Sequence, residues 1–202
     1  MKVISLSVKS SGPTPCIHQP LAIGAVAFDT DQINANGDEY IEESDSYYIQ
    51  LEWDSVNMDA TTMTENQLDI FTPPGPDGPQ HHRSFKSEKA LEEFHSWLLR
   101  LGESQYYALG TNVGFFDLSM LKSVWTYQWP FYDMSIDLDS IFTCMSLIQN
   151  RTYYSIRQKI ISRAWVSVKN IYPDAVRHNA LYNAWLNTYA FWKCIRRIQQ
   201  AF

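Results

Sequence analysis

The pattern of hydrophobic and polar positions in the first quarter of the chain is that of β-strands. Residues 3–8 are rich in apolar and β-branched side chains, and residues 47–53 alternate between apolar and polar positions. Residues 21–28 form an almost continuous apolar run, which is typical of a central strand buried on both faces. The Asn36-Gly37 pair between the second and third runs is a strong hairpin signal. We therefore predict three strands, of which the last two form a hairpin.

Helical spacing follows these strands. Between residues 87 and 101 the apolar side chains recur as on one helix face, and Ser87 is the expected N-cap. A fourth short strand is predicted over residues 106–109 and an amphipathic helix over residues 115–125. A long final helix is predicted over residues 178–198. It carries an aromatic stripe that indicates core packing, formed by Tyr182, Trp185, Tyr189 and Trp192.

The remaining segments are less regular. Residues 136–147 begin as a strand or a helix, and residues 165–171 fit either pattern. Residues 72–86 contain a run of Pro and Gly and are predicted to form a long loop. His81 and His82 in this loop cannot both face one metal ion from extended backbone, so we do not expect a metal site there.

Three strands, a helix, a strand and then further helices predict an α/β fold, with a mixed sheet flanked by helices. An antiparallel hairpin at the start and a fourth strand after a helical crossover give the order of a ribonuclease-H-like sheet. The length of 202 residues suits one domain over residues 1–202, with a basic helical region over residues 151–202.

The composition excludes a disordered or fibrous protein, because 45% of the residues are hydrophobic and only 19% are charged. No apolar run approaches the roughly 20 residues that a membrane span requires. Cys16, Cys144 and Cys194 are too few and too scattered for a disulfide framework or a zinc site. We therefore expect a soluble protein of a reducing compartment, the cytoplasm, with no membrane partner.

The net charge of −6 hides an asymmetry along the chain. Residues 1–150 contain 7 Lys and Arg against 21 Asp and Glu, a balance of −14. Residues 151–202 contain 9 Lys and Arg against Asp174 alone, a balance of +8. A basic region of this kind is either an anion-binding face or the counterpart of an acidic face within the same domain. The charge count alone leaves both interpretations open.

Short strings at three places in the chain resemble motifs of the DEDDh 3′–5′ exonucleases, and of their exonuclease VIII-like branch in particular. Residues 7–12 (SVKSSG) and 23–29 (IGAVAFD) resemble the family's opening, where a strand reading DxExxG precedes IGAVxFD. Residues 110–117 (GTNVGFFD) are similar to the second motif, in which Asn and Phe-Asp open a helix. Residues 178–184 (HNALYNA) are similar to the last motif, HxAxxD, at the head of the final helix. The strings occur in the family's order and extend over nearly the whole chain.

The resemblance implies a ribonuclease-H-like exonuclease fold and a site for two metal ions. In the family, four carboxylates hold two divalent cations about 3.5–4 Å apart, and the cations activate water and stabilise the leaving oxygen of a phosphodiester. A histidine beside them serves as the general base. Mg²⁺ and Mn²⁺ require such oxygen ligands because they are hard cations.

Carried over residue by residue, the resemblance implies a degenerate active site. Ser7 and Lys9 stand where the family has an aspartate and a glutamate. Asp117 matches the third carboxylate and is the only retained ligand position, while Asn183 replaces the last aspartate. His178 matches the general base. We therefore assign no catalytic residue and no metal ligand set to these former-site positions.

Lys9 makes metal binding at this place still less favourable. An ammonium group ~4 Å from a divalent cation repels it by several kcal/mol at an effective dielectric constant of ~20. Lys9 can instead pair with Asp117. Unaligned acids offer the remaining route to a metal site, and the candidates are Asp29, Asp137 and Asp139.

Two functions of different classes follow. The first is a non-catalytic binding module for nucleic acid or for a protein partner, with no cofactor, built on an exonuclease fold. The second is an active 3′–5′ exonuclease with a rearranged site for Mg²⁺ or Mn²⁺. The high aromatic content of 14% is compatible with a homodimer interface.

Overall fold

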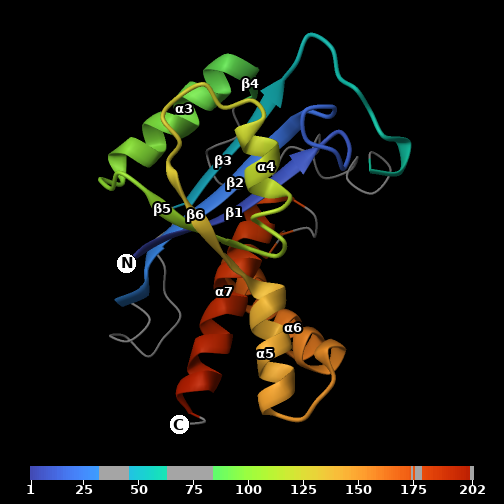
Figure 1. Ribbon diagram of the computed structural model, residues 1–202, viewed down its shortest axis with the longest axis vertical. Coiled ribbons are helices and arrows are strands. Elements are labelled where there is room, and N and C mark those ends of the chain that lie inside the picture. Colours follow the sequence, from blue (N-terminus) through green and yellow to red (C-terminus); the bar gives the residue numbers. More distant parts are fainter. Residues whose placement is uncertain (32–45, 63–83, 174, 176–178, 201–202) are drawn as a thin grey trace.

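The protein is described here from a computed structural model, which covers residues 1–31, 46–62, 84–173, 175 and 179–200. Its centre is a mixed six-stranded sheet in the order β4-β3-β2-β1-β5-β6 (Figure 1). The strands β1 and β2 pair antiparallel, β2 and β3 also pair antiparallel, and the remaining neighbours pair parallel. All strands except β2 therefore end at the same edge of the sheet. The strands are β1 (Lys2–Ser10), β2 (Pro20–Asp29), β3 (Ser46–Glu52), β4 (Ser84–Lys86), β5 (Tyr106–Gly110) and β6 (Phe131–Asp137).

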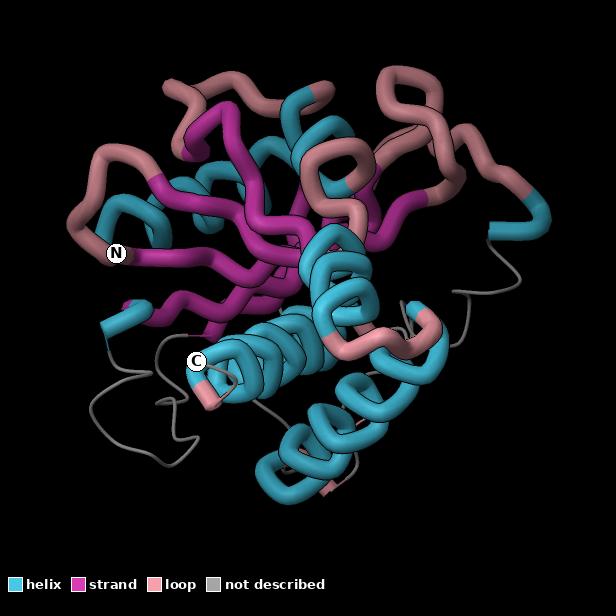
Figure 2. The backbone as a smooth tube through the Cα atoms, turned by 60° about the horizontal axis from the view of Figure 1, so that its bottom comes forward, coloured by secondary structure: helices cyan, strands magenta, loops and turns pink. Residues whose placement is uncertain are grey.

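Helices cover both faces of this sheet (Figures 1 and 2). One group of buried apolar side chains joins the sheet to α3 and α4, and another joins its opposite face to α5, α6 and α7. The predicted α/β class with a mixed sheet and flanking helices is thereby confirmed. The helices are α3 (Ser87–Arg100), α4 (Asp117–Lys122), α5 (Leu138–Ile148), α6 (Tyr153–Ile171) and α7 (Ala180–Gln199).

Successive side chains of β1 point to opposite faces of the sheet. Ile4, Leu6 and Val8 pack toward α3 and α4. Ser5, one position away, is fully buried on the α7 side, and its hydroxyl donates a hydrogen bond of 2.7 Å to the carbonyl oxygen of Ala184. A buried hydroxyl requires such a partner, so this bond ties the first strand to the last helix.

The final helix approaches the sheet closely at Gly24 in β2. A Cβ atom at this position would lie 2.2 Å from the carbonyl carbon of Ala180 and 2.3 Å from the nitrogen of Leu181. Only glycine leaves room for the helix backbone here. Since Gly24 is paired with Ser7, this contact places the first turn of α7 beside Ser7.

The observed elements correct several predictions. Ser87 is not an N-cap, because α3 follows β4 directly and Lys86 occupies the cap position without a side-chain hydrogen bond. The segment predicted as a loop over residues 72–86 ends in β4. The helix predicted over residues 115–125 is limited to α4. Residues 136–147 contain the end of β6 followed by α5, and residues 165–171 belong to α6.

Other predictions concern side chains. The aromatic stripe of the final helix is buried in the core, as predicted, with Trp185 and Tyr189 each 1% exposed. The three cysteines are free, and Cys194 is the buried one. Within the described ranges no helix is long and apolar enough to cross a membrane. Asn36-Gly37, His81 and His82 lie outside the described residues.

Candidate functional site

A pocket of about 500 Å³ opens at the edge of the sheet where β1 and β5 end, between the first residues of α4 and the facing sides of α6 and α7. It contains Ser7, Lys9, Asp117 and Asn183, four of the five positions singled out in the sequence. His178, the fifth, lies outside the described residues. The pocket is lined by Leu6, Ser7, Val8, Lys9, Thr111, Phe116, Asp117, Arg157, Ile161, Asn183, Leu186 and Asn187.

Asp117 takes its position from the divergence of two strands. The ladder between β1 and β5 ends at the Ser5–Leu109 pair, and β5 then leaves the sheet through a turn in which Asn112 has a positive φ of 57°. The backbone N–H of Val8 instead donates to the Asp117 carboxylate at 2.6 Å. The carboxylate of Asp117, the first residue of α4, thus accepts the β1 hydrogen bond that a neighbouring strand would otherwise accept.

Burial governs the charge of this carboxylate. Asp117 is 7% exposed, and its removal from water raises the pKa of its carboxyl group to about 7. The hydrogen bond from Val8 and the positive charge of Lys9 both lower this pKa, but by less than burial raises it. The group is therefore partly protonated at neutral pH. The electrostatic interaction between Lys9 and Asp117 predicted from the sequence is present, but burial outweighs it.

Asn183 from α7 and Ser7 from β1 both line the pocket. Asn179 caps α7 by accepting hydrogen bonds from the backbone N–H groups of Leu181 at 2.9 Å and Tyr182 at 3.3 Å. The helix therefore begins within two residues of the predicted start at residue 178. Asn183 and Asn187 are four positions apart, so they share one face of α7 and line the pocket together.

Arg157 in α6 is a pocket residue that the sequence motifs did not indicate. Its Nε lies 3.7 Å from Oδ1 of Asp139, and the same oxygen accepts a hydrogen bond of 2.5 Å from the Tyr153 hydroxyl. Burial and the neighbouring Asp139 raise the pKa of Tyr153 to about 12, so its hydroxyl stays protonated and continues to donate. Asp139 thereby holds Arg157 beside the pocket. The feature of the sequence that could have indicated Arg157 was the basic composition of residues 151–202.

The three acids proposed as replacement metal ligands lie outside the pocket and have other partners. Asp29 pairs with the N-terminal amine at 2.8 Å, at the far end of β1 from Ser7. Asp137 caps α5 and accepts a hydrogen bond from the backbone of Asn112 at 2.7 Å. Asp139 contacts Arg157, as described above. None of the three lines the pocket.

The donors around the pocket do not fit two divalent cations. Mg²⁺ and Mn²⁺ at such a site require several carboxylates, whereas Asp117 is the one carboxylate among the lining residues and is partly protonated at neutral pH. Lys9 and Arg157 add two positive charges to the same walls. Within the described part of the chain, no three His, Cys, Asp or Glu side chains come together as a metal-binding group.

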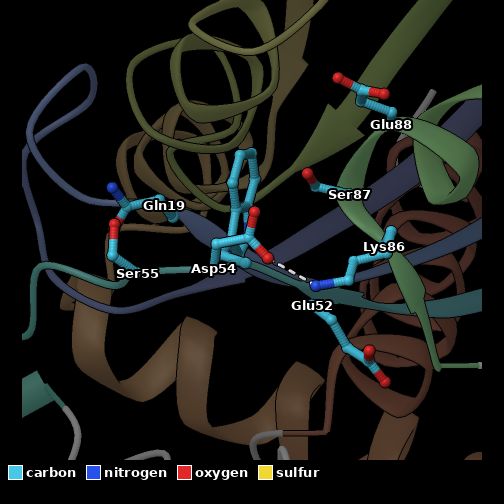
Figure 3. A pocket seen from close by; sticks show the side chains of 8 residues that line it. Gln19, Glu52, Asp54, Ser55, Lys86, Ser87 and Glu88 are labelled. Carbon is cyan, nitrogen blue, oxygen red and sulfur yellow. Dashed lines mark hydrogen bonds and ion pairs between the residues drawn. The ribbon is translucent and has the colours of Figure 1, made fainter.

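A second hollow of about 400 Å³ lies at the same edge of the sheet, where β3 and β4 end (Figure 3). The carboxylates of Glu52, Asp54 and Glu88 line it, and Lys86, the one cation among its described lining residues, pairs with Asp54 at 2.5 Å. We call it the acidic groove. Its net charge is opposite to that of the pocket.

Comparisons with known proteins agree on the fold. No protein-family model matches the chain, and no curated protein matches it in sequence. Among solved structures, cell-death related nuclease 4 (CRN-4) matches with a TM-score of 0.62 at 13% identity, over 97% of this chain and 64% of that one. E. coli exonuclease I in complex with single-stranded DNA matches with a TM-score of 0.61 at 13% identity, over 99% of this chain and 41% of that one. The chain has the fold of these exonucleases.

A third solved structure also matches nearly the whole of this chain. It is a 3′-exonuclease that recognises the 3′ end of a histone mRNA stem-loop, and it matches with a TM-score of 0.56 at 10% identity, over 98% of this chain and 82% of that one. The present chain therefore spans less than two thirds of the length of CRN-4 and of exonuclease I, and four fifths of this third enzyme. At these identities the likeness establishes the ribonuclease-H-like fold and nothing finer.

Proposed function

We propose that this protein binds a single-stranded nucleic acid without cutting it, and that the pocket between β1 and α7 receives a backbone phosphate. The observation that carries the proposal is the charge of the pocket walls, where Lys9 and Arg157 accompany a single buried carboxylate. Phosphate oxygens are natural partners for an ammonium and a guanidinium group, and such charge-assisted hydrogen bonds are among the strongest in proteins.

The chemistry of the walls supports binding over hydrolysis. In a two-metal exonuclease the cations neutralise the phosphate and activate water. Lys9 and Arg157 supply positive charge for the first task, but neither lowers the pKa of a bound water molecule as a metal ion does. Ser7, Asn183 and Asn187 add neutral hydrogen-bond donors for phosphate or sugar oxygens.

The solved structures support nucleic acid as the partner. One of them is a complex with single-stranded DNA, and another recognises the 3′ end of a histone mRNA stem-loop. A shared fold does not carry a substrate across. The agreement between that fold and a cationic pocket at the edge where five strands end is what favours a nucleic-acid strand over a protein partner.

A binding measurement with matched variants tests the proposal. A fluorescent single strand of about ten nucleotides is titrated with the protein in EDTA and in Mn²⁺, and its length is followed in parallel. We expect equal affinity in both buffers and an intact strand. Lys9→Ala and Arg157→Ala are each expected to weaken binding about tenfold, which is the loss of one charge-assisted contact.

Lys89→Ala is the control, because it removes one exposed positive charge from α3, away from the pocket. It should leave the affinity unchanged. Equal weakening by all three variants would overturn the pocket as the binding place. Mn²⁺-dependent shortening of the strand that Asp117→Ala abolishes would establish the active exonuclease instead.

A further inference from the structure

The two longest helices of the protein carry cations and no acids. Four Lys and Arg residues lie in α6 and three in α7, and neither helix contains an Asp or a Glu. These helices pack against each other on one side of the sheet (Figures 1 and 2). The positive balance of residues 151–202 therefore belongs to one layer of the structure. The cations are Arg157, Lys159, Arg163, Lys169, Lys193, Arg196 and Arg197.

Part of this charge gathers at one place, away from the pocket. Lys159 and Arg163 are four positions apart on α6 and are exposed, and Arg151 is exposed just before the helix begins. Arg197 of α7, together with Arg163 and Arg151, lowers the pKa of Lys159, so the four side chains are near one another. We call these four residues the basic face. Within the described residues none of them forms an ion pair with a carboxylate.

Like charges held together on a surface raise the free energy of the folded protein unless an anionic partner neutralises them. We infer that the basic face is a second contact for the phosphate backbone of the bound strand, reached from the pocket across the outer surface of α6. This inference rests on the proposed function, because it takes the same nucleic-acid strand as its ligand.

The exposed outer surface of α6 separates the two contacts. Arg157 lines the pocket, whereas Lys159 and Arg163 lie about half a turn around the same helix, so a strand reaches them by crossing this outer surface. Tyr154, one turn before Arg157, is 78% exposed and offers a ring on which a base can stack. Between these side chains lie Gln158 and Ser162, which are exposed and uncharged. A strand leaving the pocket on this side meets no carboxylate of α6.

Strand length and salt dependence test the second contact separately from the first. Binding of a strand of about 20 nucleotides and of one of about four nucleotides is measured at several salt concentrations. The double variant Lys159→Glu/Arg163→Glu should weaken binding of the long strand at least tenfold. It should also reduce the slope of log affinity against log salt by about 1.4, the value for two lost phosphate contacts on a single strand. The short strand, which fills only the pocket, should bind the variant and the unchanged protein equally.

The control is Lys89→Glu/Lys122→Glu, which changes the net charge by the same amount in α3 and α4. An equal loss with this control would show a general charge effect and overturn the second contact. Unchanged binding of the long strand by Lys159→Glu/Arg163→Glu would also overturn it. Neither result touches the proposed function, which is tested separately by the binding of the short strand to Lys9→Ala and Arg157→Ala and by the integrity of the strand in Mn²⁺.

Two further measurements test whether the double variant is folded and whether the basic face binds a membrane surface instead. A melting curve of Lys159→Glu/Arg163→Glu should match that of the unchanged protein or lie above it, because the variant relieves repulsion among like charges. Vesicles of phosphatidylcholine with phosphatidylserine serve as the membrane probe. Flotation of the protein with these vesicles, lost in the double variant while long-strand binding persists, would assign the basic face to a membrane surface and overturn the inference.

Discussion

The pocket and the acidic groove lie at the same edge of one sheet and have opposite charge. The pocket, at the ends of β1 and β5, holds two cations and one buried carboxylate, whereas the groove, at the ends of β3 and β4, holds three carboxylates and one cation. The carboxylates themselves also differ. Burial raises the pKa of Asp117 to about 7, while the hydrogen bond from Lys86 lowers the pKa of the exposed Asp54. The same functional group is thus partly neutral in one hollow and charged in the other.

This comparison shows that the burial of the individual side chain, and not its place at the sheet edge, decides its charge. Asp117 is 7% exposed and accepts a hydrogen bond from the backbone of β1, whereas Asp54 in the groove is 90% exposed and remains hydrated. The following changes test this difference, from the largest expected effect to the smallest.

Replacing Gly24 with alanine should have the largest effect. The new Cβ would overlap the backbone of α7 at 2.2 Å, so the helix has to move as a unit. We expect a loss of about 3 kcal/mol or more in the free energy of unfolding, measured by urea denaturation. Gly102→Ala is the comparison, since Gly102 has open space and a φ of 86° and should lose only about 1 kcal/mol. Equal losses in the two variants would contradict the close approach of α7.

Asp117→Asn should stabilise the protein in a pH-dependent way. The carboxyl group has a pKa of about 7 when folded and an ordinary value of 3.8 when unfolded. The unfolded chain therefore releases this proton first, and the contribution of Asp117 to stability falls as pH rises from about 4 through about 7. The asparagine variant does not titrate and should be more stable at pH 8, by at most about 4 kcal/mol for a shift of about three pKa units, with little difference near pH 4. Melting curves at both pH values check this, and a loss of stability of equal size at both would refute it.

Tyr153→Phe should have a moderate effect at the rim of the pocket. It removes the hydrogen bond of 2.5 Å that the tyrosine hydroxyl donates to Asp139, the carboxylate beside Arg157. We expect a loss of about 1 kcal/mol in the free energy of unfolding. Tyr154→Phe is a control at the adjacent position, because Tyr154 is 78% exposed. If the two variants lose the same stability, the Tyr153–Asp139 bond makes no specific contribution.

Lys86→Ala should have the smallest effect. Its partner Asp54 is 90% exposed and Lys86 itself is 69% exposed, so water screens the pair. The melting temperature should not change measurably, although the groove becomes more negative. A decrease as large as that of Tyr153→Phe would show that the groove is less hydrated than its exposed side chains indicate.

The sequence predicted the central strands and the grouping of the pocket residues with good accuracy. The apolar run over residues 21–28 is typical of a buried strand, and it lies within β2. The three motif strings specified which strand ends and helix starts meet, and Ser7, Asp117 and Asn183 do line one pocket. The roles of these residues in binding, and the absence of catalysis, remain predictions that the experiments above address.

Two edge strands escaped prediction. The sequence of β6 alternates apolar and polar residues from Tyr132 to Asp137, but only Phe131 in this strand is buried, so the alternation does not mark a face turned to the core. The strand β4 has only three residues. The pKa of Asp117 was also not predictable, because desolvation depends on the side chains that surround the carboxylate in space. The pairing of Lys9 with Asp117 expected from the sequence lowers this pKa, but burial raises it by more.

The hydrogen bond between Ser5 and Ala184 has a consequence for how the protein is made. Ser5 and Ala184 are 179 positions apart. The hydroxyl of Ser5 and the apolar face around it in β1 are therefore covered only after nearly the whole chain has been synthesised. Contacts of such long range slow folding and leave sheet surface exposed during translation. A ribosome stalled before residue 184 should therefore hold a nascent chain that is sensitive to protease and binds chaperones, and release of the final helix should end both properties.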